Sequence, residues 1–157
     1  MQLPLFATTL CQRRDLIQTV EGWLVTEWPS WYGSGGRGDV EKDVNAFAKS
    51  ETDLPIGMVV QEGDQPVGVG ALKTESISTH LHLGPWAAAG YVLPSHRGRG
   101  IGAFLLQALV ARAKTLGFPH VYCGTSTSNS LLERSGWHLM EAVELQGKPL
   151  GVYRSAA

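Results

Sequence analysis

Hydrophobic and polar residues follow one another along the chain with two periods, which together predict an α/β fold. Alternation at every second residue, or a short unbroken apolar run, indicates a strand, and apolar residues three and four apart indicate a helix with one buried face. Strands are expected at residues 4–10, 56–61, 67–73, 87–93, 120–125, 137–145 and 150–153. Helices are expected at residues 15–28, 40–49, 101–117 and 126–135.

Turn-forming residues set the ends of these elements. Residues 62–66 and 146–149 are polar segments with glycine and proline, and each is expected to close a hairpin. Asp15 is a candidate N-cap of the first helix, and Pro29 stands where that helix would stop. The clearest amphipathic stripe consists of Ile101, Phe104, Leu105, Ala108 and Leu109.

A glycine-rich segment, residues 31–38, separates the first two helices. It begins with Trp31 and Tyr32 and is rich in glycine from there on, which favours a mobile loop. Such a loop is either a lid over a binding site or a plain connection between helices, and the sequence leaves both open.

Length and composition limit the classes of protein that fit. The chain has 157 residues, and we expect a single domain over residues 1–157. Its formal net charge of −1 lacks the basic excess that draws proteins to nucleic acid, so no nucleic-acid partner is expected. Without a leader or a long apolar stretch, we expect a cytoplasmic protein with no membrane partner. The two cysteines, Cys11 and Cys123, lack metal-ligand spacing, and no metal is expected.

The segment most informative about chemistry joins the strand at 87–93 to the amphipathic helix. Its sequence is Arg97-Gly98-Arg99-Gly100-Ile101-Gly102. Glycine lets a backbone approach a ligand closely, and amides at a helix N-terminus converge on an anion. The expected ligand is therefore a phosphate or a pyrophosphate.

Two well-known phosphate-binding motifs use similar loops, and the spacing disfavours both. The dinucleotide fingerprint needs G-x-G-x-x-G early in the chain, whereas four predicted strands precede this run. The P-loop needs Gly-Lys followed by Ser or Thr, which the run lacks.

The run does match the pattern [Gln/Arg]-x-x-Gly-x-[Gly/Ala], with Arg97, Gly100 and Gly102 in the specified places. In this it resembles the signature of the GNAT superfamily of N-acetyltransferases, and the resemblance extends over almost the whole chain. It implies a GNAT fold, with a mixed, mostly antiparallel central sheet of about six or seven strands, a splayed central strand and about four helices.

The resemblance implies two stretches of backbone that bind acetyl-CoA. Gly90, Tyr91 and Val92 are implied to pair with the pantetheine arm, and the Gly90 amide to contact the thioester carbonyl as a catalytic oxyanion donor. A glycine inside a strand independently suggests a bulge or a close backbone approach, with core packing as the alternative. Asn129 is implied to contact the pantetheine arm or a water, with helix capping as the alternative. The residues implied to hold the pyrophosphate are Arg97, Gly98, Arg99, Gly100, Ile101, Gly102 and Ala103.

Acetyl transfer requires that the attacking amine lose a proton and that the departing thiolate gain one. Many members of the superfamily protonate the thiolate from a tyrosine four residues before the glycine that ends the last short helix. Counting back from Gly136 reaches Leu132, which has no proton to give. The general-acid candidates that remain are Tyr91 and Tyr122, with Tyr153, Ser130 and protonation by solvent as further alternatives.

The general base is equally open. The histone-modifying branch of the superfamily carries a glutamate four residues before the oxyanion position, and Trp86 stands there in this chain. His82 is the base candidate, with His80 and Glu75 close by in sequence. For all three residues a solvated loop position is the alternative.

The leading expectation is an N-acetyltransferase that transfers an acetyl group from acetyl-CoA to a primary amine of a small molecule or a peptide by direct attack on the thioester. A CoA-binding regulatory or interaction module with little turnover is the first alternative, because of Leu132, and a nucleotide-binding module is the second. Dimers are common in the superfamily, so a homodimer is a further expectation. The carboxylates that either line the acceptor mouth or lie on solvated helix faces are Glu27, Asp39, Glu41 and Asp43.

Overall fold

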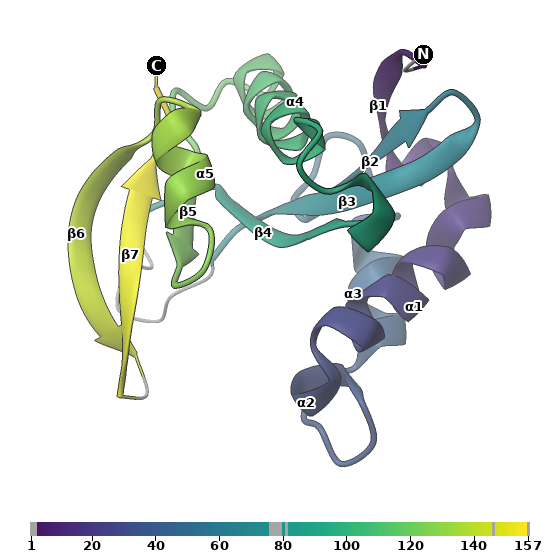
Figure 1. The fold of residues 1–157 in the computed structure, drawn as a ribbon, viewed down its shortest axis with the longest axis horizontal. Coiled ribbons are helices and arrows are strands. Elements are labelled where there is room, and N and C mark those ends of the chain that lie inside the picture. The colour runs from purple at the N-terminus through teal and green to yellow at the C-terminus, as the bar shows by residue number, and fades with distance from the viewer. Residues whose placement is uncertain (1–2, 76–79, 81, 146, 157) are drawn as a thin grey trace.

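The computed structural model describes residues 3–75, 80, 82–145 and 147–156, which form one seven-stranded sheet covered by helices on both faces (Figure 1). The strands are β1 (Leu5–Thr9), β2 (Ile56–Glu62), β3 (Gln65–Lys73), β4 (Trp86–Val92), β5 (Tyr122–Thr125), β6 (His138–Leu145) and β7 (Lys148–Arg154). They lie in the order β1-β2-β3-β4-β5-β7-β6, and only the β4–β5 pair is parallel. The mixed, mostly antiparallel sheet expected from the sequence is confirmed.

The described part of the chain holds five α-helices, one more than expected. They are α1 (Ile17–Glu27), α2 (Pro29–Tyr32), α3 (Val40–Phe47), α4 (Ile101–Thr115) and α5 (Asn129–Arg134). The additional helix is α2, which Pro29 begins after the chain bends at Trp28. Proline suits the first position of a helix, because the amide that it lacks would have no partner there. Among the described residues, no helix has both the length and the hydropathy needed to cross a membrane.

Two candidate helix caps, Asp15 and the alternative role considered for Asn129, are wrong. The carboxylate of Asp15 accepts two 3.0 Å hydrogen bonds from Arg13, and a 3₁₀ turn over Arg14–Leu16 precedes α1. The N-cap of α5 is Ser128 rather than Asn129. In both places the side chain is hydrogen-bonded to another side chain and not to the helix end.

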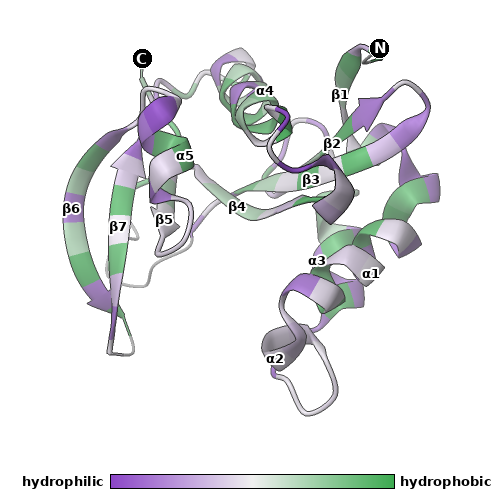
Figure 2. Ribbon diagram, viewed as in Figure 1, coloured by the Kyte–Doolittle hydropathy of each residue, from purple (hydrophilic) through white to green (hydrophobic). Residues whose placement is uncertain are grey.

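The sheet separates two apolar cores, and alternate residues of β2 show how. Met58 and Val60 pack with α4 on one face, whereas Val59 packs with α1 and α3 on the other. This alternation is the period-two pattern of a strand that is buried on both faces. Figure 2 shows the same arrangement as hydrophobic residues along α4 and along the strands that it covers.

The strands β4 and β5 meet at one position and then diverge. Trp86 pairs with Tyr122, and the Tyr122 amide donates to the Pro85 carbonyl at 2.9 Å. Beyond that pair β4 stays with β3, while β5 stays with β7. Figure 1 shows the two strands separating below α4. The splayed central strand is therefore confirmed, and it leaves the edge of β4 that faces β5 without a strand partner.

Candidate functional site

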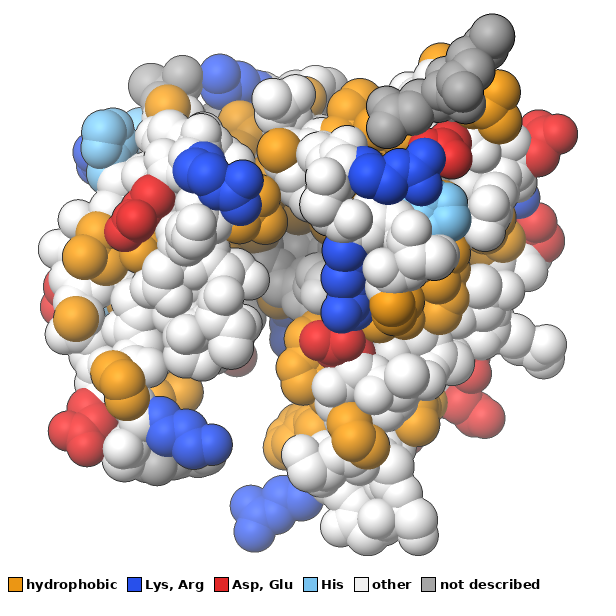
Figure 3. All heavy atoms as spheres, viewed as in Figure 1, with side chains coloured by type: hydrophobic (Ala, Val, Ile, Leu, Met, Phe, Trp, Pro, Cys, Tyr) orange, Lys and Arg blue, Asp and Glu red, His pale blue; other side chains and the backbone are white. Residues whose placement is uncertain are grey.

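A cavity of about 760 Å³ lies where β4 and β5 diverge. Its walls come from β4, the loop that leads into α4, the first half of α4, the end of β5, and α5. Glu27 and Trp28, at the C-terminal end of α1, also line it. Figure 3 shows the surface hollowed here, between the half that holds β5–β7 and the half that holds α1–α3. The fold thus gathers segments from the first, middle and last parts of the chain around one space.

The glycines of the signature loop lie in this cavity for a conformational reason. Gly98 has φ +78° and Gly100 has φ +83°, the left-handed region that side chains disfavour by about 1–2 kcal/mol. A Cβ atom on either residue would meet no protein atom within 4 Å. Protein packing does not require glycine at these positions, whereas backbone conformation does, and the space beside them is open to a ligand.

The amides of this loop suit an anion. From Gly98 to Ala103, no backbone amide donates a hydrogen bond to any other group in the described part of the chain, and the first such bond is from Phe104 to the Gly100 carbonyl. The first turn of α4 also lacks an acidic residue. Free amides at the start of a 15-residue helix carry partial positive charge, which the helix dipole reinforces. Phosphate groups bind at such helix ends.

The side chain of Arg97 is tied to the protein. Its Nε donates to the Val92 carbonyl at 2.9 Å, and its guanidinium lies 3.4 Å from a Glu27 carboxylate oxygen. The guanidinium also lies over the Tyr91 ring, 5.6 Å from its centroid. These contacts join the end of α1 to the end of β4 at the edge of the cavity.

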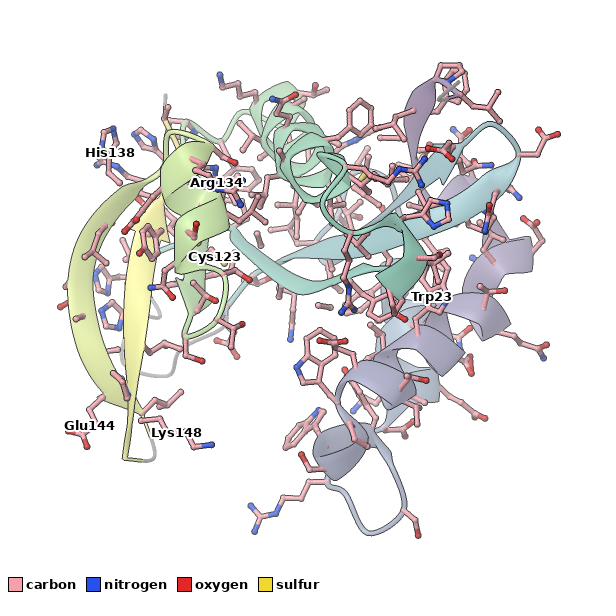
Figure 4. All side chains as sticks on the ribbon, in the orientation of Figure 1. Trp23, Cys123, Arg134, His138, Glu144 and Lys148 are labelled. Atoms are coloured by element: carbon pink, nitrogen blue, oxygen red, sulfur yellow. The ribbon has the colours of Figure 1, made fainter. Side chains whose placement is uncertain are left out.

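Arg134 is a cation that lines the cavity without a carboxylate partner among the described residues. Its Nε donates to the Ser130 carbonyl at 3.3 Å, which leaves its terminal nitrogens free to bind a ligand. Figure 4 shows Arg134 on α5, on the side toward α4. The sequence did not single out this residue, because a basic residue near a helix C-terminus is common on any surface.

The predicted bulge of β4 lies beside Gly90. The register against β3 shifts between Val69 and Ala71, and Ala89, which faces this shift, has φ +55°. Gly90 is exposed and lines the cavity, so the core-packing alternative for it is not supported. A strained residue of this kind commonly marks a functional site. Tyr91 and Val92 also line the cavity along the unpaired edge of β4.

Of the tyrosines considered as general acids, the structure brings only Tyr91 to the cavity. The Tyr91 ring stacks on Trp23 with 5.5 Å between centroids. Tyr122 instead packs on Trp86 at 5.7 Å. The buried Tyr153 donates to Glu133 at 3.1 Å and accepts from Asn129 at 3.0 Å.

These contacts place the other predicted residues of α5 as well. Asn129 and Ser130 are not among the residues that line the cavity, and the Asn129 amide group is bonded to Tyr153. Leu132, in contrast, lines the cavity and is 1% exposed. An apolar side chain therefore occupies the wall at the position where a tyrosine was expected.

None of the predicted base candidates reaches the cavity. His82 is exposed and stacks on the His80 ring, with 6.0 Å between centroids. The His80 Nε2 contacts the Glu141 carboxylate on β6. Trp86 is fully buried, and its indole donates to the Leu83 carbonyl at 2.9 Å. Trp86 is therefore a packing residue.

The glycine-rich segment at residues 31–38 is not among the residues that line the cavity either. Its own backbone bonds close it, from Gly36 to Gly33 and from Gly38 to Trp31. The Tyr32 hydroxyl donates to Asp43 of α3 at 2.6 Å, and burial together with this bond raises the pKa of Tyr32. These contacts favour a plain connection over a lid.

A further set of cavity residues, 125–128, runs from the end of β5 into the turn before α5. Thr125 accepts hydrogen bonds at its Oγ1 from the Thr127 and Ser128 amides, at 3.2 and 2.9 Å, and so shapes the turn into α5. The only signal for these residues in the sequence was their position just after a strand, where ligands of α/β sheets often bind. Cys123 also lines the cavity without having been predicted to, and it lies on β5 beside this turn (Figure 4).

The thiol of Cys123 gives a pH-dependent probe of the cavity. Burial raises the pKa of Cys123 to about 11, so at pH 8 only about one thiol in a thousand is the reactive thiolate. In a Cys11→Ser background, we expect the alkylation rate to rise with pH until about pH 11, and we expect added CoA to slow it. Mass spectrometry after timed iodoacetamide treatment measures both effects. Fast alkylation at pH 7 would contradict the burial of this thiol.

Comparisons with known proteins agree with this geometry. The sequence matches the model of the acetyltransferase (GNAT) family over residues 17–137. The structure is similar to an aminoglycoside 6′-N-acetyltransferase complexed with coenzyme A, at a TM-score of 0.77 and 15% identity over 96% of each chain. It is also similar to the aminoglycoside 6′-N-acetyltransferase from Enterococcus faecium (0.75, 15%, 96% of each chain) and to yncA from Salmonella typhimurium with its cofactor acetyl-CoA (0.66, 14%, 98% of this chain and 93% of that one). The search of curated proteins found no match.

The class that the fold and the family match indicate is an acyltransferase. The family match covers more than half of the chain, and the chain therefore belongs to the acetyltransferase (GNAT) family. The structural similarities, at these identities, concern the fold.

Proposed function

We propose that this protein transfers an acetyl group from acetyl-CoA to a primary amine of a small molecule or a peptide. The observation that carries the proposal is that the unpaired edge of β4 lines one cavity together with Gly98 and residues 100–103, whose amides are free. The amides suit a pyrophosphate, and the open strand edge suits the amide groups of pantetheine. An acyl-CoA molecule carries both groups, because its pantetheine arm, which contains two amides, runs from the pyrophosphate to the thioester.

In this proposal the bulge of β4 aims the Gly90 amide at the thioester carbonyl. The amine attacks the carbonyl carbon, negative charge develops on the carbonyl oxygen, and the amide donates a hydrogen bond to it. The C–S bond then breaks, and the thiolate leaves with a proton from a donor. Because the cavity holds both reactants, proximity supplies a large part of the rate.

For the proton donor, the cavity favours Tyr91 over Tyr122, since only Tyr91 lines it. Water that enters the open cavity is the alternative donor. Among the described residues, His96 and Glu27 are the histidine and carboxylate that line the same space, and each of them contacts a charged partner. We therefore assign deprotonation of the amine to water.

The apolar wall at Leu132 leads to a testable expectation. Leu132→Tyr adds a hydroxyl at the position where relatives carry their acid, and we expect kcat to rise up to about tenfold if thiolate protonation limits turnover. Leu132→Phe is the matched control, because it adds the ring without the proton. The larger ring is expected to cost about 1–3 kcal/mol of folding stability in both variants. If the tyrosine variant is no faster than the phenylalanine variant, protonation is not limiting.

A thiol-release screen tests the proposed function. Acetyl-CoA is offered with a panel of amines, and free CoA is measured with a thiol reagent. The panel holds monoamines, peptides with free amino groups and aminoglycosides, since two similar structures are aminoglycoside acetyltransferases. Amine-dependent release supports the proposal. Calorimetric binding of acetyl-CoA without release would favour a binding module, and binding of ATP or NAD in its place would overturn the proposal.

A further inference from the structure

A carboxylate lies next to the loop that we propose to bind pyrophosphate. Glu62 ends β2, and its side chain is only 14% exposed. One carboxylate oxygen lies 3.0 Å from a guanidinium nitrogen of Arg99, and the other lies 3.7 Å from Nε2 of His96. A negative charge at this place opposes an anionic ligand unless a cation neutralises it.

The side chain of Arg99 neutralises Glu62 and does not line the cavity. Gly98 and Gly100 on either side of it line the cavity, but Arg99 does not. Its guanidinium donates a hydrogen bond to Glu62, a residue 37 positions away in the chain. The loop is thereby fastened to the β2–β3 hairpin.

His96 is a secondary partner of Glu62. Its distance to the carboxylate is too long for a hydrogen bond, whereas its Nδ1 lies 2.8 Å from the Ser95 hydroxyl. The direct bond to Glu62 therefore comes from Arg99 alone among the described residues.

We infer that Glu62 and Arg99 form a positioning pair for the cofactor loop, an inference that rests on the proposed function. Arg99 neutralises Glu62 and holds the loop so that the amides of Gly98 and of residues 100–103 face the pyrophosphate. Neither side chain touches the cofactor. Removing Arg99 alone leaves a mostly buried carboxylate beside the phosphates without its hydrogen-bonded cation, and removing both side chains leaves no such charge.

A double-mutant cycle tests this pair through CoA affinity. We expect Arg99→Gln to raise the Kd for CoA about tenfold and Glu62→Gln to raise it about threefold. The double variant Glu62→Gln with Arg99→Gln is expected to bind CoA better than Arg99→Gln alone, because the opposing charge is gone. Isothermal titration calorimetry measures the four affinities, and thermal melting verifies that each variant is folded.

The Glu62→Gln variant separates the pair from a direct contact. If Arg99 bound a phosphate itself, removing Glu62 would free its guanidinium and take away a negative charge, so Glu62→Gln would bind CoA at least as tightly as the wild type. That outcome overturns the inference, as do wild-type affinity in Arg99→Gln and a double variant that binds CoA no better than Arg99→Gln. Asp64→Asn is the matched control, since it removes an exposed carboxylate from the turn of the same hairpin and should leave CoA affinity unchanged. If the wild type does not bind CoA, the proposed function fails, and the same cycle with inorganic pyrophosphate still decides whether Glu62 and Arg99 act as a pair on anion binding.

Discussion

Gly100→Glu is expected to raise the Kd for acetyl-CoA by at least about a hundredfold. The new side chain would project from the N-cap of α4, where a Cβ atom meets no protein atom within 4 Å. It would therefore enter the space that we propose for the cofactor. Its negative charge would also face the pyrophosphate. Isothermal titration calorimetry with acetyl-CoA measures the loss.

The matched control for this variant lies at the other end of the same helix. Gly117 has φ +93°, and a Cβ atom on it would meet no protein atom within 4 Å, so Gly117→Glu adds a similar backbone strain and the same charge away from the cavity. We expect Gly117→Glu to lose some stability, by about 1–2 kcal/mol, and to bind acetyl-CoA as the wild type does. Equal affinities of the two variants would show that the loop does not hold the cofactor.

Trp86→Ala is expected to lower the free energy of unfolding by about 3–5 kcal/mol. Trp86 is fully buried, packs on Tyr122 and donates its indole hydrogen to Leu83. It also forms the single registered pair between β4 and β5, so the cavity is expected to lose its shape at that end. Urea denaturation gives the change in free energy, and a fall in Tm of about 10 °C is expected with it.

Trp31→Ala serves as the comparison for the buried tryptophan. Trp31 is 49% exposed, and its removal should cost less than about 1 kcal/mol. Trp86→Phe keeps a ring and tests the indole hydrogen bond by itself, with an expected cost of about 1–3 kcal/mol. A Trp86→Ala variant as stable as Trp31→Ala would show that the junction of β4 and β5 does not depend on this side chain.

The charges around the cavity bear on the acceptor. Of the acidic residues considered at its mouth, only Glu27 lines it, and Glu27 contacts Arg97. Asp39 instead caps α3 by accepting from the Lys42 amide at 3.0 Å, and Asp43 accepts from Tyr32. The described residues therefore do not form a cluster of carboxylates that would bind a polyamine acceptor. For this reason the acceptor panel includes monoamines and peptides.

Local features of the sequence were sufficient to predict most of the elements and the glycine-rich loop before α4, which we propose to bind the cofactor. Strand and helix periods depend on residues close in the chain, so the expected elements agree with the structure except at α2 and at two caps. The positive φ values of Gly98 and Gly100 likewise follow from a loop that must turn into a helix within a few residues. The absence of a tyrosine at Leu132 was also evident from residue counting alone.

Only the tertiary structure decided which side chains share the cavity. The order and register of the sheet place Tyr91 and Leu132 in it, while Tyr122 packs against Trp86 and is not among its lining residues. The pair of Glu62 and Arg99 likewise joins residues from two separate segments. Spacing along the chain carries no information on such contacts, because they depend on which strands become neighbours and on the face toward which each side chain points.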